Sequence, residues 1–185
     1  LVRTAAETPP ALVLTAKSIP RAKGDSMARK GVGVITLPDN RWERVDIKSV
    51  GLLPNAIAKQ KAREAGAYEA WFVDEDGYVT EGSSTTAWIV TQNGTLVTRP
   101  NGTDILPGIT RQTATEVAHR LGFPVEERKF TVDEAKAARE AFITAASTIV
   151  MPVVSIDGAP VANGHPGSIA TELRANFHEV AEKLR

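Results

Sequence analysis

The residues that could carry out chemistry begin with one lysine at the end of a run of strand-forming residues. Lys48 closes the segment from Arg41, in which Val45 and Ile47 alternate with polar residues, so we predict a strand over 41–48. A partly desolvated site favours the neutral form of an amine, and a neutral lysine can attack a carbonyl to form a Schiff base. Most lysines are simply solvated, so position alone leaves both interpretations open.

A glutamate followed by small polar residues forms the second candidate group. Glu81 precedes Gly82 and four hydroxyl residues at 83–86. A carboxylate at this place could pair with a cationic ring nitrogen while the hydroxyls meet polar atoms of a ligand. The same composition is also typical of a β-bulge between strands, so the segment by itself favours neither interpretation.

A third group lies where a helix is expected to begin, in the segment 105–111. Gly108 permits close approach of the backbone, and a helix that starts at Thr110 directs free N–H groups and its positive dipole end at whatever lies there. Thr110 is also a plausible N-cap, so ordinary capping competes with a phosphate seat. The segment 144–148, at the end of a further strand, suits either backbone contact with a ligand or tight packing in a sheet.

The elements around these candidates are typical of an antiparallel sheet. Three pairs of strand-like runs are joined by Asp76-Gly77, Asn93-Gly94 and Asp157-Gly158. These dipeptides supply the positive φ that tight hairpin turns need. We also expect strands over 9–16 and 31–37, with a linker over 19–25.

Four segments carry the signals of helices. They cover residues 53–65, 110–121 and 131–139, followed by a terminal helix whose apolar stripe is Ile169, Leu173, Phe177, Val180 and Leu184. The helix at 131–139 opens with a capping box from Thr131 to Glu134. Hairpins interspersed with helices, without regular alternation of strand and helix, predict the α+β class rather than a doubly wound sheet.

Composition excludes several classes of function. The 185 residues include 22 Lys and Arg and 22 Asp and Glu, so the net charge is 22 − 22 = 0, which argues against a nucleic-acid partner. The absence of cysteine excludes a disulfide framework and a thiol nucleophile, and the three histidines lack metal-ligand spacing, so we expect no metal site. No apolar stretch approaches the roughly 20 residues that span a bilayer. We expect a cytoplasmic enzyme or binding domain without a membrane partner.

Five motifs, taken together and in order, resemble the class IV pyridoxal-phosphate-dependent aminotransferases, with the D-amino-acid aminotransferase type as the nearest match. The motifs are DIKSVGLLPN at 46–55, AKQ at 58–60, EAGAYEA at 64–70, VTEGSS at 79–84 and ILPGITR at 105–111. The resemblance covers nearly the whole chain. It implies fold type IV, a large barrel-like domain of mostly antiparallel hairpins with flanking helices, and pyridoxal 5′-phosphate as the cofactor.

The resemblance also implies roles for individual residues. Lys48 matches the lysine that forms the internal aldimine with pyridoxal phosphate and then moves the proton, and Glu81 matches the carboxylate that pairs with the protonated pyridine nitrogen. The other implied cofactor-binding residues are Ser84, Leu106 against the ring, Gly108, Ile109 and Thr110 of the phosphate cup, and Ala145 and Ala146, which could offer only backbone N–H groups. Thr86, Ala145 and Ala146 depart from the residues usual in the family.

The function implied is exchange of an amino group between an α-amino acid, with the D-configuration favoured, and a 2-oxo acid, by a homodimer. A branched-chain aminotransferase, an R-selective amine transaminase, an aminodeoxychorismate lyase and a non-catalytic domain of the same descent remain open. The resemblance assigns residues 1–22 to the last strand and exit of a small N-terminal domain plus linker, and 23–185 to the large cofactor-binding domain. We expect a fragment, a processed form or part of a longer chain, whose missing portion holds the arginines for substrate and phosphate.

Overall fold

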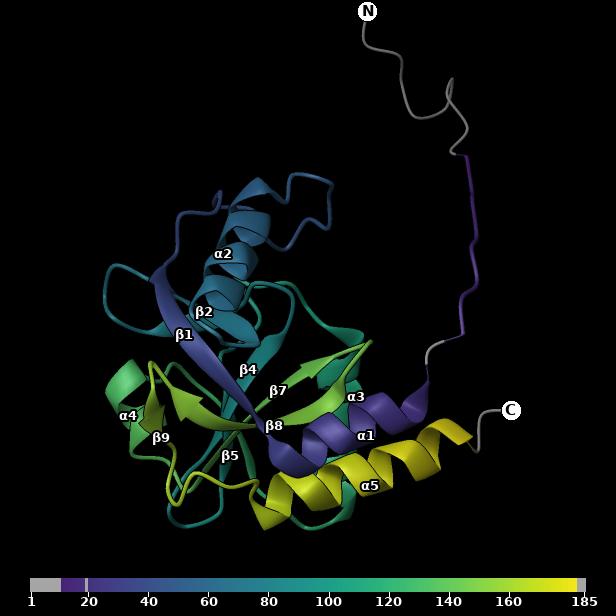
Figure 1. Ribbon diagram of the computed structural model, residues 1–185, viewed down its shortest axis with the longest axis vertical. Coiled ribbons are helices and arrows are strands. Elements are labelled where there is room, and N and C mark those ends of the chain that lie inside the picture. Colours follow the sequence, from purple (N-terminus) through teal and green to yellow (C-terminus); the bar gives the residue numbers. More distant parts are fainter. Residues whose placement is uncertain (1–10, 19, 183–185) are drawn as a thin grey trace, which may run out of the picture.

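The computed structural model describes residues 11–18 and 20–182, and this part of the chain contains five α-helices and nine β-strands (Figure 1). The helices are α1 (Arg21–Lys30), α2 (Leu53–Glu64), α3 (Ile109–Arg120), α4 (Val132–Lys136) and α5 (Ser168–Glu182). The strands are β1 (Val32–Pro38), β2 (Glu69–Val73), β3 (Val79–Gly82), β4 (Thr86–Val90), β5 (Leu96–Thr98), β6 (Val125–Glu127), β7 (Glu140–Ala145), β8 (Ile149–Ile156) and β9 (Ala159–Pro160).

The described strands form one curled sheet in the order β3-β2-β1-β8-β7-β4-β5-β6, with β9 paired to β8. β1 runs parallel to both of its neighbours, β2 and β8, and β5 runs parallel to β6. The other five pairings are antiparallel. The predicted fold, an α+β domain built mostly from antiparallel hairpins with flanking helices, is confirmed.

The three predicted hairpins are present. Gly77, Gly94 and Gly158 have φ angles of 85°, 89° and 79° at the turns that join β2 to β3, β4 to β5 and β8 to β9. At the third turn Asp157 also has a positive φ of 51°, as a type I′ turn requires. The carboxylate of Asp157 accepts a hydrogen bond of 2.7 Å from the backbone of Thr36, which fixes this turn to β1.

Three expectations about the first fifty residues are wrong. Residues 41–48 form bends and turns rather than a strand, and their backbone bonds to the rest of the chain are confined to the Thr103 carbonyl, which Val45 reaches at 2.8 Å. Residues 11–16 pair with no described strand, and 9–10 lie outside the described residues. Most of the expected linker is α1, which buries Ala28 against the core. β-propensity depends on context, so strand-forming residues alone do not make a strand.

The predicted helices are present, with differences at their ends. In α4 the hydroxyl of Thr131 accepts from the backbone N–H of Glu134 at 3.1 Å, so the capping box is confirmed. The helix ends at Lys136 rather than at 139, because the chain turns there and Arg139 donates to the Val90 carbonyl of β4. In α5 the stripe residues Ile169 and Leu173 are buried, whereas Leu184 and the side chain of Val180 lie outside what is described.

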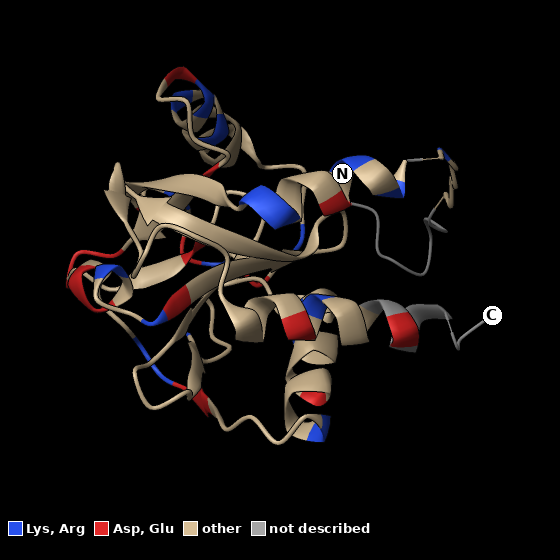
Figure 2. Ribbon diagram, turned by 60° about the horizontal axis from the view of Figure 1, so that its bottom comes forward, with Lys and Arg blue, Asp and Glu red and all other residues tan. Residues whose placement is uncertain are grey.

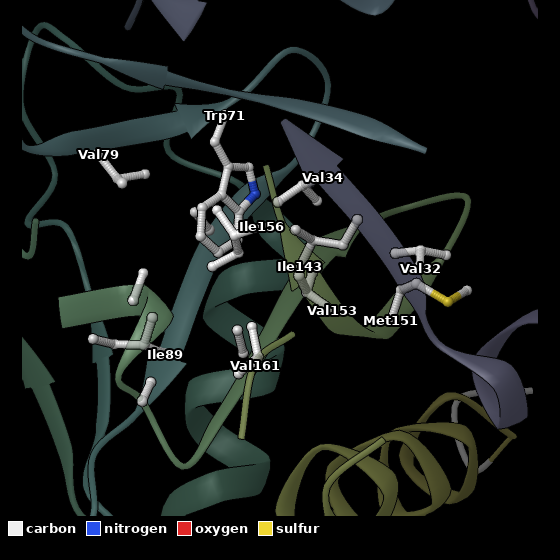
Figure 3. Packing of buried hydrophobic residues seen from close by; sticks show 14 of the residues in the cluster. Val32, Val34, Trp71, Val79, Ile89, Ile143, Met151, Val153, Ile156 and Val161 are labelled. Carbon is white, nitrogen blue, oxygen red and sulfur yellow. The ribbon is translucent and has the colours of Figure 1, made fainter. Parts of the chain in front are cut away.

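Apolar clusters lie on both faces of the sheet. On one face Trp71 packs among Ile143, Met151 and Ile156 (Figure 3), and its ring meets that of Phe130 edge to face at 6.3 Å. On the other face Trp88 and Phe142 stack at 5.4 Å with an interplanar angle of 12°, beneath apolar residues of α3 and α5. Alternation along β4 and β7 therefore divides the sequence between two cores.

The remaining helices complete the frame around the sheet. α2 covers β1 and β2 through Ala58 and Ala62, which contact a small cluster that includes Phe72. Charged residues of both signs are spread over the helices and loops, while the strands are mostly free of them (Figure 2). Among the described helices none is long and apolar enough to cross a membrane.

Candidate active site

A cleft of about 1200 Å³ opens at one end of the sheet. Its walls are the loop 40–52, the start of α2, the segment 81–86, the segment 106–111 and the turn after β7. Every residue assigned to catalysis or cofactor binding from the sequence lies on these walls: Lys48, Glu81, Ser84, Leu106, Gly108, Ile109, Thr110, Ala145 and Ala146. Segments up to about a hundred residues apart in the chain therefore meet at one cavity, and their roles there remain predictions.

Glu81 is the buried acid of the cleft, with only 6% of its surface exposed. It lies in β3, its carboxylate is paired with the guanidinium of Arg41, and its Oε2 accepts a hydrogen bond of 3.2 Å from the backbone N–H of Leu106. Burial raises the pKa of Glu81 to about 7, against the lowering effects of Arg41 and of the Leu106 amide.

Arg41 is a functional candidate that sequence reasoning missed. Its side chain is 2% exposed, and it donates through Nε and Nη2 to both oxygens of Asp39, at 2.8 and 2.6 Å, while Nη1 pairs with Glu81. In the sequence, only its position seven residues before Lys48, inside a run that resembles a strand, could have pointed to a role in the site. The partners lie 2 and 40 residues away, and no sequence periodicity connects them.

The charges of this group are unequal. Asp39 and Glu81 are two acids and Arg41 is one base, so the ionised group carries one net negative charge beside the cleft. Although burial opposes it, hydrogen bonds from Arg41 and Thr80 lower the pKa of Asp39 below its ordinary value, so Asp39 is ionised before Glu81, whose pKa is about 7. A cationic atom of a ligand placed beside Glu81 would balance the remaining charge.

Lys48 lies on the loop 40–52 rather than at the end of a strand, and its side chain is exposed at the wall of the cleft. Two residues before it, Asp46, also at the cleft wall, forms an ion pair with Arg44 at 2.8 Å. Lys48 makes no hydrogen bond or ion pair with the described residues. Its amine is therefore available to a ligand in the cleft.

The hydroxyl segment after Glu81 is held from behind by a second buried acid, Glu69, which is fully buried. The carboxylate of Glu69 accepts from the hydroxyls of Ser83 and Ser84, from the backbone of Ala70 and from Lys59 at 3.1 Å. Each serine uses its single hydroxyl hydrogen to donate a hydrogen bond to Glu69. Toward the cleft its hydroxyl oxygen can therefore only accept a hydrogen bond. Sequence reasoning found Ser84 but missed Glu69 and Lys59, which belong to other elements.

The start of α3 offers unused backbone donors to the cleft. Its N-cap is Gly108, which has no side chain to accept from the first turn, so the predicted capping role of Thr110 is wrong. Thr110 instead lies one residue inside the helix, half-buried at the cleft wall. A Cβ at Gly108 would lie 3.3 Å from the hydroxyl of Thr86, so a side chain there would crowd this wall of the cleft. The arrangement suits an anion.

The turn after β7 faces the same cavity. Its residues Ala145, Ala146 and Ser147 line the cleft, and the backbone N–H of Thr148 closes the turn on the Ala145 carbonyl at 3.1 Å. Because alanine carries no polar side-chain atom, any polar contact from the first two must come from the peptide groups.

A flat ligand with an anionic group at one end and a cationic ring nitrogen fits this set of donors and acceptors. The helix start at Gly108 would receive the anion, the carboxylate of Glu81 the ring nitrogen, and the exposed amine of Lys48 a carbonyl. The cleft also holds a buried hydroxyl, that of Thr85, with no hydrogen-bond partner among the described residues. Pyridoxal 5′-phosphate has the required features.

The chain is similar in sequence to curated proteins named D-alanine aminotransferase. The chain is 42% identical over 161 residues to a D-alanine aminotransferase of Bacillus licheniformis, covering 87% of this chain and 56% of that protein. It is 38% identical over 177 residues to a D-alanine aminotransferase of Staphylococcus aureus strain COL, covering 95% and 61%. The chain thus spans less than two thirds of the length of these relatives.

Solved structures give the same fold. A T.th. branched-chain amino acid aminotransferase with pyridoxamine 5′-phosphate superimposes with a TM-score of 0.79 and 34% identity, over 87% of this chain and 54% of that one. A hypothetical aminotransferase from Mycobacterium tuberculosis in its apo form gives 0.79 and 26%, over 91% and 61%. The model of the family described as amino-transferase class IV matches residues 2–156, which confirms the resemblance of the motifs: the chain belongs to the class IV aminotransferases.

Proposed function

We propose that this chain is the cofactor-binding part of a pyridoxal-phosphate-dependent transaminase, which moves an amino group between an α-amino acid and a 2-oxo acid. The observation that carries the proposal is the meeting of three groups at one cleft. These are the amine of Lys48, the net negative group around Glu81, and the uncapped start of α3 at Gly108. Each has a chemistry that pyridoxal phosphate requires.

When bound, the cofactor supplies an electron sink for the pair of electrons left when a substrate Cα loses its proton. Glu81 would hold the ring nitrogen in its protonated state, because a carboxylate beside a cation favours the charged form of that cation. Arg41 keeps Glu81 in place, and with Asp39 it limits the charge of the group to one net negative. The first turn of α3 would bind the phosphate through backbone N–H groups.

The role we assign to Lys48 is to bind the cofactor through its amine and to move the proton at the substrate Cα. A lysine on the loop 40–52 can reach a ligand from the rim, and its amine is not engaged by any described side chain. Leu106 would pack against the ring of the cofactor. Ser84 would accept a hydrogen bond from the ligand, because its hydroxyl hydrogen is already donated to Glu69.

For the substrate we propose a D-amino acid, with D-alanine as the first compound to test. The sequence relatives that carry the name D-alanine aminotransferase, at 42% and 38% identity, support this assignment. The branched-chain aminotransferases among the structural neighbours, at 34% identity, support L-configured branched-chain amino acids as the second candidate. Initial rates with D-alanine, L-leucine and L-valine, each with 2-oxoglutarate, separate the two.

The cofactor assignment is tested by spectroscopy. Pyridoxal phosphate added to the protein should give a visible absorption band that borohydride removes, and digestion should then place the added mass on the peptide containing Lys48. Lys48→Ala should give no such peptide, while Lys61→Ala, an exposed lysine of α2, should behave like the wild type. Modification spread over several lysines, or none at Lys48, would refute the assignment.

Three wider features belong to the same proposal. We assign residues 1–22 to the exit from a smaller N-terminal domain and residues 23–185 to the cofactor-binding domain. A homodimer is supported by the exposure of large apolar side chains at the cleft wall, among them Trp42, Ile47 and Leu52. Light scattering after size exclusion measures this state directly. The cytoplasmic location stays a prediction.

A further inference from the structure

One residue of the sheet has a backbone conformation that its side chain disfavours. Ile149 begins β8 with φ of +60°, in the left-handed region. For a β-branched residue this conformation is a genuine outlier, and such outliers persist only where the surroundings enforce them. Ile149 pairs with Ala145 across the hairpin that joins β7 to β8, so it sets the shape of the turn between them.

The guanidinium of Arg174 binds the backbone on both sides of Ile149. Nη1 of Arg174, in α5, donates to the carbonyl of Thr148 at 2.6 Å and to the carbonyl of Val150 at 2.8 Å. The two peptide groups flank Ile149 on either side. The side chain of Arg174 is 11% exposed, so water competes little for these bonds.

The same guanidinium is anchored at its other end. Nη2 of Arg174 donates to Oδ1 of Asp25 at 2.9 Å, which connects α5 to α1. Asp25 in turn lies 3.5 Å from Arg21, one turn earlier in α1. The clamp on Ile149 therefore has a fixed support in the body of the molecule.

The clamped turn is one wall of the cleft. Ala145, Ala146 and Ser147 line the cavity, as do Gly108 and Thr110 of α3. Ala145 and Ala146 offer only peptide groups, and because Ile149 pairs with Ala145, the conformation at Ile149 shapes the turn that carries these groups. A relaxed Ile149 would move into the β or right-handed region and rotate the preceding peptides.

We propose that Arg174 is a positioning residue, which holds Ile149 in its left-handed conformation and so aims the backbone N–H groups of the turn 145–148 at an anionic group of the ligand. The inference rests on the proposed function, because it takes the anion to be the phosphate of the cofactor. Arg174 itself touches no ligand, since it does not line the cleft.

The test measures phosphate recognition apart from activity and apart from Lys48. The probes are 4-deoxypyridoxine 5′-phosphate and 4-deoxypyridoxine, which lack the aldehyde and differ only in the phosphate. Calorimetric titration of the full chain gives the ratio of their two affinities. For Arg174→Met we expect this ratio to fall about tenfold, the equivalent of one hydrogen bond to a charged group, with the affinity for 4-deoxypyridoxine unchanged.

Two further variants show whether the effect passes through Ile149. Glycine adopts positive φ without cost, so in an Ile149→Gly background the loss caused by Arg174→Met should shrink to about twofold or less. Arg128→Met is the matched control. Arg128 also donates to a backbone carbonyl, that of Lys129, and to a carboxylate, that of Glu134, but it lies away from the cleft. Its ratio should equal that of the wild type.

The outcomes are distinguishable. If the wild type binds neither probe, the proposed function fails. If the wild type prefers the phosphorylated probe and Arg174→Met keeps that preference, the positioning role is refuted. It is also refuted if Arg174→Met lowers the preference by the same factor in the wild type and in the Ile149→Gly background. Should Arg174→Met not fold, Asp25→Ala removes the carboxylate that anchors the guanidinium. It should then lower the ratio at least twofold, and an unchanged ratio would also overturn the proposal.

Discussion

The backbone N–H of Leu106 donates a hydrogen bond of 3.2 Å to the carboxylate of Glu81. This bond joins β3 to the segment that leads into α3, so the acid proposed for the ring nitrogen and the helix start proposed for the phosphate are held in one arrangement. With Arg41 on its other oxygen, Glu81 has a partner at each carboxylate oxygen before any ligand binds.

The pKa of Glu81 predicts how stability depends on pH. In the folded chain it lies at about 7, above the ordinary value of 4.5, so between these values the folded state binds more protons than the unfolded state. The contribution of Glu81 to stability is therefore fully present at pH 4.5 and is lost as the pH rises to 7, by up to about 3 kcal/mol. Glu81→Gln should lack this dependence.

Urea unfolding of the wild type and of Glu81→Gln at pH 5 and pH 8 measures the effect. The free energy of unfolding of Glu81→Gln, relative to that of the wild type, should be lower at pH 5 than at pH 8. Glu64→Gln, on the exposed end of α2, is the control and should show the same difference at both pH values. A constant difference for Glu81→Gln would contradict the burial argument.

Removal of Arg41 should leave two acids facing each other. In Arg41→Met, Asp39 and Glu81 lose their shared base, which predicts a loss of about 3–5 kcal/mol in the free energy of unfolding at pH 8. The loss should be smaller at pH 6, where Glu81 takes up a proton. Arg41→Lys should recover only part, because one ammonium cannot reproduce the bidentate contact with Asp39 and also reach Glu81. Equal losses at pH 6 and 8 would show that the acids do not interact.

The acid behind the hydroxyl segment gives a third prediction. Glu69→Gln replaces a carboxylate that accepts four hydrogen-bond donors with an amide that has one acceptor oxygen, and we expect a loss of about 2 kcal/mol. Thermal unfolding, with Lys59→Met and the double variant, gives the coupling between the two residues. If Glu69 and Lys59 act as a pair, the double variant costs less than the sum of the single ones.

Gly82 should tolerate no side chain. A Cβ there would lie 2.1 Å from the hydroxyl oxygen of Thr85 and 3.1 Å from its carbonyl, so Gly82→Ala must displace the hydroxyl segment. We expect a loss of stability of about 1–3 kcal/mol. Gly24→Ala is the control for added volume. A Cβ at that helical position would make only an ordinary contact of 3.5 Å with Arg174, so no loss is expected. An unchanged melting temperature for Gly82→Ala would show that the segment adapts freely.

The parts of the fold that could be predicted are those decided by neighbours in the chain. Asp157-Gly158 specifies its hairpin through two positive φ values, and Thr131 caps α4 with an atom three residues from its partner. The resemblance of the motifs brought Lys48, Glu81 and Gly108 to one cleft for the same reason, since each lies in a short motif of neighbouring residues.

What could not be predicted depends on contacts across the chain. The segment 41–48 has the composition of a strand, yet it pairs with no described strand, and Arg41 instead forms an ion pair with Glu81, forty residues later. Glu69 reads as a polar residue of an ordinary strand until the fold places Ser83, Ser84 and Lys59 around it. The position of Ile149 in the left-handed region also follows from Arg174 in another element.

The place of β1 has a consequence for how the molecule is made. This strand lies between β2, about thirty-five residues later, and β8, about one hundred and twenty residues later. A ribosome must therefore release nearly the whole described chain before the middle of the sheet can close, and contacts so distant in sequence slow the search for the native state. Until then one edge of β1 is open to incorrect pairing, so the nascent chain should depend on chaperones.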